Sequence, residues 1–222
     1  MVKALIPHKK KVTVNPRERI LNAAEELFAQ RGFEATSMRA LTNAAKVNLA
    51  SVNYYFGSKN KLITQVLDRG LRELNTERLK RLDALEKETP PPTLEKILEA
   101  LFLPAFQLFE DPHKVFFLRI LCRAHYESKN FARALIEKEW GPISQRFCTA
   151  MKRSLPDTPD KELYWRLHFA VGSMIHALSE RQTLNAATGS LRQPEDYQRI
   201  IERLIAFSAA GIRLIANHGG AK

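Results

Sequence analysis

The stretch SMRALTNAAKVNLASVNYYF, residues 37–56, contains two short helical patterns separated by a tight turn at residues 46–48. Thr36 or Ser37 can cap the first helix, and Asn48 can cap the second, because these side chains accept hydrogen bonds from free backbone amides. Two helices joined by so short a turn are typical of a helix-turn-helix, whose second helix enters the major groove of DNA. An ordinary αα-hairpin has the same periodicity, so the spacing alone leaves both interpretations open.

In the helix-turn-helix interpretation the second helix has an inner and an outer face. Val47 would pack beneath the turn, and Val52 and Phe56, one helical turn apart, would hold the helix against the core. Asn53 on the outer face can pair bidentately with adenine, and Tyr54 can contact a thymine methyl group or a phosphate. The predicted outer face consists of Ala50, Ser51, Asn53 and Tyr54.

The charge distribution favours a polyanionic partner for the N-terminal part of the chain. The net charge is +11, and residues 1–62 hold 11 basic and 4 acidic residues, a net charge of +7. Clustered Lys and Arg gain affinity for nucleic acid by releasing counterions from phosphates. The alternative is a basic surface that only keeps the protein in solution.

Composition indicates a globular protein of the cytoplasm. The chain has 222 residues, a length compatible with one or two domains, and 45% of them are hydrophobic. Its two cysteines, Cys122 and Cys148, lie in apolar helical stretches, where we expect buried thiols and no disulfide scaffold. The longest uncharged apolar stretches are shorter than the ~18 residues of a membrane span, and residues 1–11 have no signal-peptide core. Secretion and membrane insertion are disfavoured.

Helical periodicity recurs along nearly the whole chain and predicts an all-α fold of about nine or ten helices. Besides those in residues 37–56, the predicted helical segments are Pro16–Arg31, 58–82, 93–109, 112–125, 131–155, 163–178 and 197–215. We expect Pro104 to kink or split one segment, and Gly141 with Pro142 to interrupt another. The only strand-like fragment, residues 12–14, is too short to begin a sheet.

The N-terminal segment resembles the DNA-binding domain of the TetR family of transcriptional repressors. The resemblance covers Pro16 to Leu67, about a quarter of the chain, and rests on GFEATSMR at residues 32–39 and AKVNLASVNYYFGSK at residues 45–59. The aromatic pair and the lysine three residues after Phe56 fall at the family's spacing. This sequence departs from the family's pattern at Leu41-Thr42, where Ile-Ala is usual, at Lys46, where glycine is usual, and at Asn53, where tyrosine is usual.

The resemblance implies a set of DNA contacts. Ser37 would contact a phosphate, and Arg39 would contact a base edge. Tyr55 and Lys59 would bind phosphates. Lys59 also follows Ser58 in a first helical turn, where free amides and a cation make an anion site. For Tyr55 a place in the core is the alternative. The full predicted set is Ser37, Arg39, Lys46, Asn48, Ala50, Ser51, Asn53, Tyr54, Tyr55 and Lys59.

We expect three parts in the chain: a basic arm at residues 1–15, a helix-turn-helix domain at 16–67 and a helical domain at 68–222. Lys3, Lys9, Lys10, Lys11 and Arg17 could let the arm follow the DNA backbone or enter the minor groove; an arm without a role is the alternative. By resemblance the last domain would form a homodimer and hold a small-molecule inducer. Segments 163–178 and 197–215 combine apolar with small residues, which suits a four-helix contact between subunits or burial within one subunit.

An aromatic-rich segment followed by two arginines is the candidate inducer site. The predicted lining residues are Leu101, Phe102, Phe106, Phe117, Arg119 and Arg123. An apolar cavity with a cationic anchor suits an amphiphilic acid such as a fatty acid or an acyl-CoA. The recognition helix also resembles that of family members that respond to fatty acyl compounds. A packed core with snorkelling arginines is the alternative.

These observations predict a ligand-responsive repressor that binds a pseudo-palindromic operator as a dimer. A constitutive or architectural DNA-binding regulator is the alternative. No His-Glu-x-x-His, Cys-x-x-Cys or Gly-rich phosphate loop supports an enzyme, and we expect neither a cofactor nor a metal.

Overall fold

The computed structural model describes residues 15–112, 114–126, 130–179 and 197–214, and these ranges contain helices and no strand. The helices are α1 (Pro16–Arg31), α2 (Met38–Ala45), α3 (Leu49–Phe56), α4 (Lys59–Leu85), α5 (Leu94–Gln107), α6 (Lys114–Tyr126), α7 (Asn130–Ser154), α8 (Asp160–Ser179) and α10 (Tyr197–Leu214). The all-α prediction is confirmed. The strand-like fragment at residues 12–14 lies outside the described residues.

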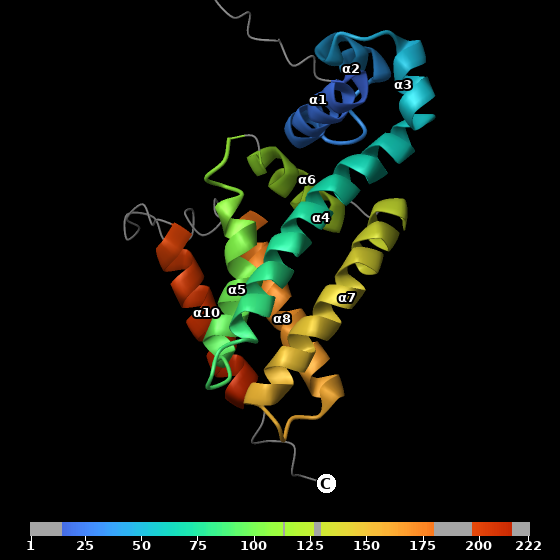
Figure 1. Ribbon diagram of the computed structural model, residues 1–222. Coiled ribbons are helices and arrows are strands. Elements are labelled where there is room, and N and C mark those ends of the chain that lie inside the picture. The colour runs from blue at the N-terminus through green and yellow to red at the C-terminus, as the bar shows by residue number, and fades with distance from the viewer. Residues whose placement is uncertain (1–14, 113, 127–129, 180–196, 215–222) are drawn as a thin grey trace, which may run out of the picture.

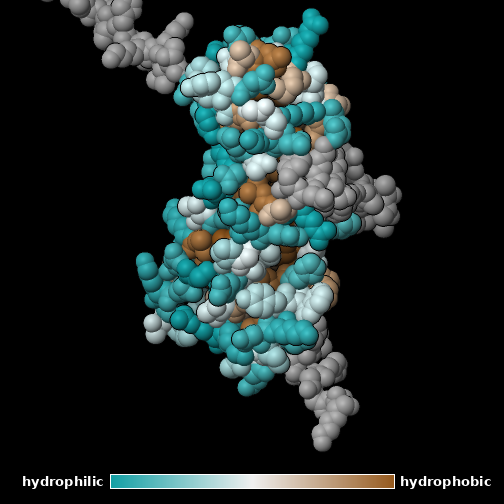
Figure 2. All heavy atoms as spheres, turned by 90° about the vertical axis from the view of Figure 1, so that its right-hand side faces the viewer, coloured by the Kyte–Doolittle hydropathy of each residue, from teal (hydrophilic) through white to brown (hydrophobic). Residues whose placement is uncertain are grey.

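The first three helices form a head at one end of α4, and the C-terminal helices form a body around the rest of α4 (Figure 1). In the body, α4 packs against α5 and α7, while α8 and α10 complete the helical layer. α6 lies where head and body meet and contacts both α1 and α4. One cluster of buried hydrophobic side chains extends from Ile20 in α1 to Ile212 in α10, so head and body share a core. On the face shown in Figure 2 the hydrophobic surface is limited to separate patches.

The helices of the head begin and end where the sequence predicts. Asn15 Oδ1 accepts a hydrogen bond from the Arg17 amide at the start of α1, and Gly32, with φ of 84°, follows its last residue. Ser37 caps α2. Thr36 is buried instead, where its hydroxyl donates to the Gly32 carbonyl at 2.8 Å. Asn48 and Ser58 cap α3 and α4 in the same way.

The two helices with internal prolines are continuous, which corrects the prediction of a split at Pro104 and of an interruption at Gly141 and Pro142. α5 runs through Pro104 without splitting, and α7 runs through Gly141 and Pro142 without interruption. A proline lacks the amide that would bond the carbonyl four residues earlier, and its ring crowds the preceding turn. Two side chains of α4 donate to the carbonyls next to those that lose this donor.

Each of the two donors bonds the carbonyl three residues before a proline. Arg78 Nε donates to the Leu101 carbonyl of α5 at 3.0 Å, and Asn75 Nδ2 donates to the Glu139 carbonyl of α7 at 3.3 Å. Both side chains are buried, and Arg78 Nη1 also donates to Asn75 Oδ1 at 3.1 Å. These bonds tie α4 to both helices at the points where a proline weakens them.

α4 connects the head to the body as one helix. It ends at Leu85, three residues beyond the predicted end, and it passes through residue 67, the predicted domain boundary. At Gly70 the ring of Phe117 in α6 comes so close that a Cβ atom would lie 2.2 Å from Phe117 Cδ2. The absence of a side chain at Gly70 is what permits this approach.

Within the described ranges, no helix is long and apolar enough to cross a membrane. The same residues contain no group of three or more His, Cys, Asp or Glu side chains that could hold a metal ion.

Candidate nucleic-acid interface

The turn between α2 and α3 is closed by backbone hydrogen bonds. The Val47 amide donates to the Thr42 carbonyl at 3.0 Å, and the Lys46 amide donates to the Asn43 carbonyl at 3.3 Å. Lys46 adopts a left-handed conformation with φ of 53°, which most residues other than glycine avoid. This turn therefore holds an exposed lysine in a conformation that glycine adopts without strain.

The helix α3 has the two faces that the sequence predicts. Val52 and Phe56 are buried, whereas Ala50, Asn53 and Tyr54 are exposed, Tyr54 to 83%. Asn48 and Ser51 are joined at the start of the helix, because Asn48 Oδ1 accepts hydrogen bonds from both the amide and the hydroxyl of Ser51 at 2.8 Å. The exposed face lacks charged side chains and offers an amide and a phenol as hydrogen-bonding groups.

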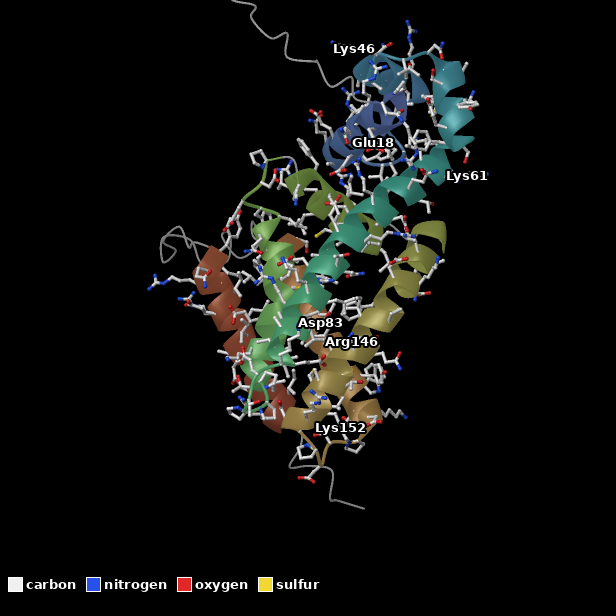
Figure 3. The ribbon with its side chains drawn as sticks, viewed as in Figure 1. Glu18, Lys46, Lys61, Asp83, Arg146 and Lys152 are labelled. Atoms are coloured by element: carbon white, nitrogen blue, oxygen red, sulfur yellow. The ribbon has the colours of Figure 1, made fainter. Side chains whose placement is uncertain are left out.

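Cationic side chains flank this face. Arg39 on α2 and Lys46 in the turn are exposed, and Lys46 lies at the end of the head distant from the body (Figure 3). Lys59 Nζ donates to the Glu34 carbonyl at 3.2 Å, which places the ammonium group beside the turn between α1 and α2. Lys61, also exposed, lies at the outer edge of the head near the start of α4.

Sequence reasoning missed Lys61. The signal was present, because Lys61 shares the first turn of α4 with Lys59 and both would favour a nearby phosphate.

Two further predicted contacts differ in burial, because Ser37 is exposed and Tyr55 is half-buried. Ser37 Oγ accepts a hydrogen bond from the Ala40 amide at 3.1 Å, so its hydroxyl hydrogen is available to another acceptor. Tyr55 is half-buried, packs against the hydrophobic core and meets Tyr54 edge-to-face at 5.1 Å between ring centroids. This position is compatible with both interpretations of Tyr55.

The arm prediction is wrong for Arg17. Arg17 lies in α1, its Nη2 donates to Gln65 Oε1 of α4 at 2.6 Å, and its guanidinium lies 5.7 Å from the centroid of the Phe56 ring. Bonding across 48 residues of sequence fixes this side chain to the head. The lysines at positions 3, 9, 10 and 11 lie outside the described residues.

A second arginine ties the head to α4. Arg69 donates to Asn22 Oδ1 at 2.9 Å and to Glu18 Oε2 at 3.3 Å, and it forms an ion pair with Glu25. Burial raises the pKa of the Glu25 carboxyl, although the hydrogen bond and the charge of Arg69 act in the opposite direction. Four side chains thus couple the orientation of α1 to that of α4.

The six predicted ligand-binding residues differ in burial. Leu101, Phe102 and Phe106 are buried in α5, and Phe117 is buried in α6. Arg119 is exposed and Arg123 is half-buried. A cleft of about 1580 Å³ between α1, α4 and the segment that joins α5 to α6 has both charged and apolar side chains in its lining, and it is lined by Phe117 but by none of the other five.

The helices α8 and α10 carry exposed aromatic side chains. Phe169 is 58% exposed and Phe207 is 70% exposed. Trp165 stacks on Phe169 with ring centroids 5.7 Å apart. Exposed glycines, Gly172 and Gly211, lie on the same two helices, so another helix could approach closely there.

Two family models match the chain. One, described as "Bacterial regulatory proteins, tetR family", matches residues 20–66, and one described as "Tetracyclin repressor-like, C-terminal domain" matches residues 99–211. The HTH-type transcriptional repressor Rv3405c of Mycobacterium tuberculosis is 42% identical over 80 residues. This match covers 36% of the chain and 39% of the length of the relative, so most of both proteins lies outside it.

Solved structures share the whole fold at low sequence identity. The fatty acid degradation regulator FadR from Bacillus halodurans superimposes with a TM-score of 0.68 and 13% identity, covering 92% of this chain and 99% of that one. AibR in complex with isovaleryl coenzyme A and operator DNA superimposes with a TM-score of 0.65 and 15% identity, covering 87% and 97%.

Proposed function

Because the chain belongs to the TetR family of bacterial transcriptional regulators, we propose that it is a ligand-responsive repressor that acts as a homodimer in the cytoplasm. Family membership makes it a regulator, not an enzyme. The observation that carries the proposal is the exposed, uncharged face of α3 with the cations Arg39, Lys46 and Lys61 around it. Amides and hydroxyls can read base edges, as arginine also can, and phosphates are held by cations beside them.

The proposed contacts divide between bases and backbone. Ala50, Ser51, Asn53 and Tyr54 face the base edges, and Arg39 reaches a base from α2. Ser37, Lys46, Tyr55 and Lys59 hold phosphates, and Asn48 orders the first turn of α3 through Ser51. In a dimer two such surfaces would meet a pseudo-palindrome whose half-sites are about 34–36 Å, or a multiple of this, apart.

Two substitutions in the head should weaken DNA binding in different ways. Lys59→Ala should weaken binding to operator and random DNA alike and reduce the slope of log affinity against log salt by about one for each lost phosphate contact. Asn53→Ala should cost about 1–3 kcal/mol per half-site, mainly on the operator, because a base contact is lost. The operator is first obtained by selecting bound genomic fragments, and affinities are then measured by fluorescence anisotropy at several salt concentrations.

Lys80→Ala is the matched control, because Lys80 is an exposed lysine of α4 that belongs to the body. It should leave both affinities unchanged. If Lys59→Ala and Asn53→Ala behave like Lys80→Ala, the proposed interface is wrong.

For the ligand we propose an amphiphilic acid, such as a fatty acid or an acyl-CoA, that binds at Leu101, Phe102, Phe106 and Phe117. Arg119 and Arg123 of α6 would anchor its anionic end. The support is the apolar character of this set and the shared fold of AibR, whose structure contains isovaleryl coenzyme A. To take an operator from 99% to 1% bound, the ligand must favour the released state by about 5.5 kcal/mol.

Titration of long-chain fatty acids and their coenzyme A thioesters should release a labelled operator, and Arg119→Ala and Arg123→Ala should each raise the concentration needed. The expected cause is loss of a charge-assisted contact to the acid. If both variants release the operator at the same ligand concentration as the wild type, the anchoring role is contradicted. No release by any acyl compound would favour the alternative, a constitutive or architectural regulator.

A further inference from the structure

A small pocket between α7 and α8 has a distinctive lining. Its volume is about 340 Å³, near the lower limit of small-molecule sites. The lining residues are Trp140, Ser144, Lys161, Tyr164, Trp165, Leu167 and His168. Three of these are aromatic, and none is acidic.

The basic side chains that line the pocket, Lys161 and His168, have no acidic counterpart in its lining. Lys161 is exposed and forms no ion pair within the part of the chain that the structure describes. His168 lies edge-on to Trp165 with ring centroids 5.9 Å apart. Because an anion placed here meets donors and no carboxylate, the pocket favours negative charge.

A buried cation lies on another side of Trp140. The Arg78 guanidinium carbon is 6.0 Å from the centroid of the Trp140 ring, and the residue is only 4% exposed. Its hydrogen bonds go to the Leu101 carbonyl and the Asn75 side chain, and no described carboxylate pairs with it. A buried charge without a counterion acts over a longer distance than an exposed one, so it adds to the positive potential at Trp140.

We propose that this pocket binds a small planar aromatic carboxylate. The ring of the ligand stacks against the indole rings of Trp140 and Trp165, and the carboxylate meets the Lys161 ammonium and the His168 imidazole. Three aromatic side chains favour a flat ring over a flexible chain. The volume admits a ligand of one or two rings.

The pocket is distinct from the proposed acyl site in α5 and α6. It lies on the side of α8 that faces α7, while Trp165 also stacks on Phe169. The binding proposal does not depend on the proposed repressor function, because it can be measured without DNA.

Tryptophan fluorescence reports on this pocket directly, since both tryptophans of the chain line it. The full-length protein is titrated with benzoate, with benzamide, which has the ring without the charge, and with hexanoate, which has the charge without the ring. We expect a saturable change with benzoate and a Kd at least about fivefold lower than for either of the others, the ratio set by one ion pair or one ring contact. No saturable change with benzoate, or equal Kd values for benzoate and benzamide, would overturn the proposal.

The variant Lys161→Gln tests the position of the carboxylate. It should raise the Kd for benzoate about fivefold and leave that for benzamide unchanged, because only the ion pair is lost. Lys138→Gln is the control, because Lys138 is an exposed lysine of α7 outside the pocket lining, and it should change neither Kd. An unchanged benzoate Kd in Lys161→Gln would contradict the site. Benzoate binding supports the pocket whether or not an operator complex dissociates, which separates this result from the proposed function.

Discussion

Replacing Gly70 by alanine is expected to lower the free energy of unfolding by roughly 1–3 kcal/mol, the usual cost of overpacking a core. The new Cβ would lie 2.2 Å from Cδ2 and 2.3 Å from Cε2 of Phe117, far inside van der Waals contact. Phe117 is 4% exposed, so its ring or α6 must shift to accommodate the new methyl group. Chemical denaturation of wild type and variant measures the difference.

Gly141→Ala is the matched control. Gly141 is also helical, and a Cβ there would meet no atom within 4 Å apart from its own chain neighbours. Helix propensity favours alanine, whereas the ring of the following Pro142 crowds a Cβ at this position, so the free energy of unfolding should change by no more than about 1 kcal/mol. The double variant Gly70→Ala/Phe117→Ala should show less than the sum of the two single losses, because the smaller side chain leaves room for the new methyl group. Stabilisation by Gly70→Ala would show that α4 and α6 do not approach this closely.

Substitution of Gly70 should also affect the orientation of the head, because residues next to it contact α1. Its neighbour Arg69 bonds Glu18, Asn22 and Glu25 of α1. α6 also packs on α1. A shift of α6 against α4 would therefore act on the same contacts that orient the head.

The elements that sequence reasoning predicted best are those that local chemistry determines. Ser37, Asn48 and Ser58 bond amides three residues further on, so their caps can be read from neighbouring residues. The two faces of α3 follow from periodicity in the same way.

Predictions failed where the deciding partner is distant in sequence. The continuity of α5 and α7 through their prolines is supported by Arg78 and Asn75 of α4, 23 and 64 residues away from the carbonyls they bond. Local sequence predicted a kink or a split in α5 and an interruption in α7, because it contained the prolines and not the distant donors. Arg17 was assigned to the arm for its charge, but its partner Gln65 lies in another helix.

The candidate sites show the same division. The reading face of α3 comes from one short segment, so its residues could be listed from sequence. The pocket at Trp140 and Trp165 combines two helices, and nothing in either one predicts that the two indoles line the same space. The proposed acyl site has the same difficulty, since its residues come from α5 and α6 and differ widely in burial.

The largest effect on operator binding is expected from the double variant Phe169→Asp/Phe207→Asp. We propose that α8 and α10 form the dimer contact, because they are in contact with each other and expose these two rings. Burying a phenylalanine contributes about 1.5–3 kcal/mol, and a two-fold contact uses each ring twice. Loss of the rings should raise the dimer dissociation constant at least about a thousandfold, and new carboxylates near their own symmetry copies should raise it further. Sedimentation velocity measures the dimer directly.

Affinity for the full operator should fall when the dimer dissociates. A monomer binds only one half-site and lacks the higher affinity of two linked heads. Binding to an isolated half-site should stay unchanged, since the head is untouched. Tyr164→Asp is the control: it alters an exposed aromatic residue of α8 on the side that faces α7, and it should leave the dimer intact. If the double variant remains dimeric, the subunit contact lies on another surface. A dimer lost with operator affinity unchanged would mean that one head is enough to bind, which would contradict the proposed recognition of a palindrome.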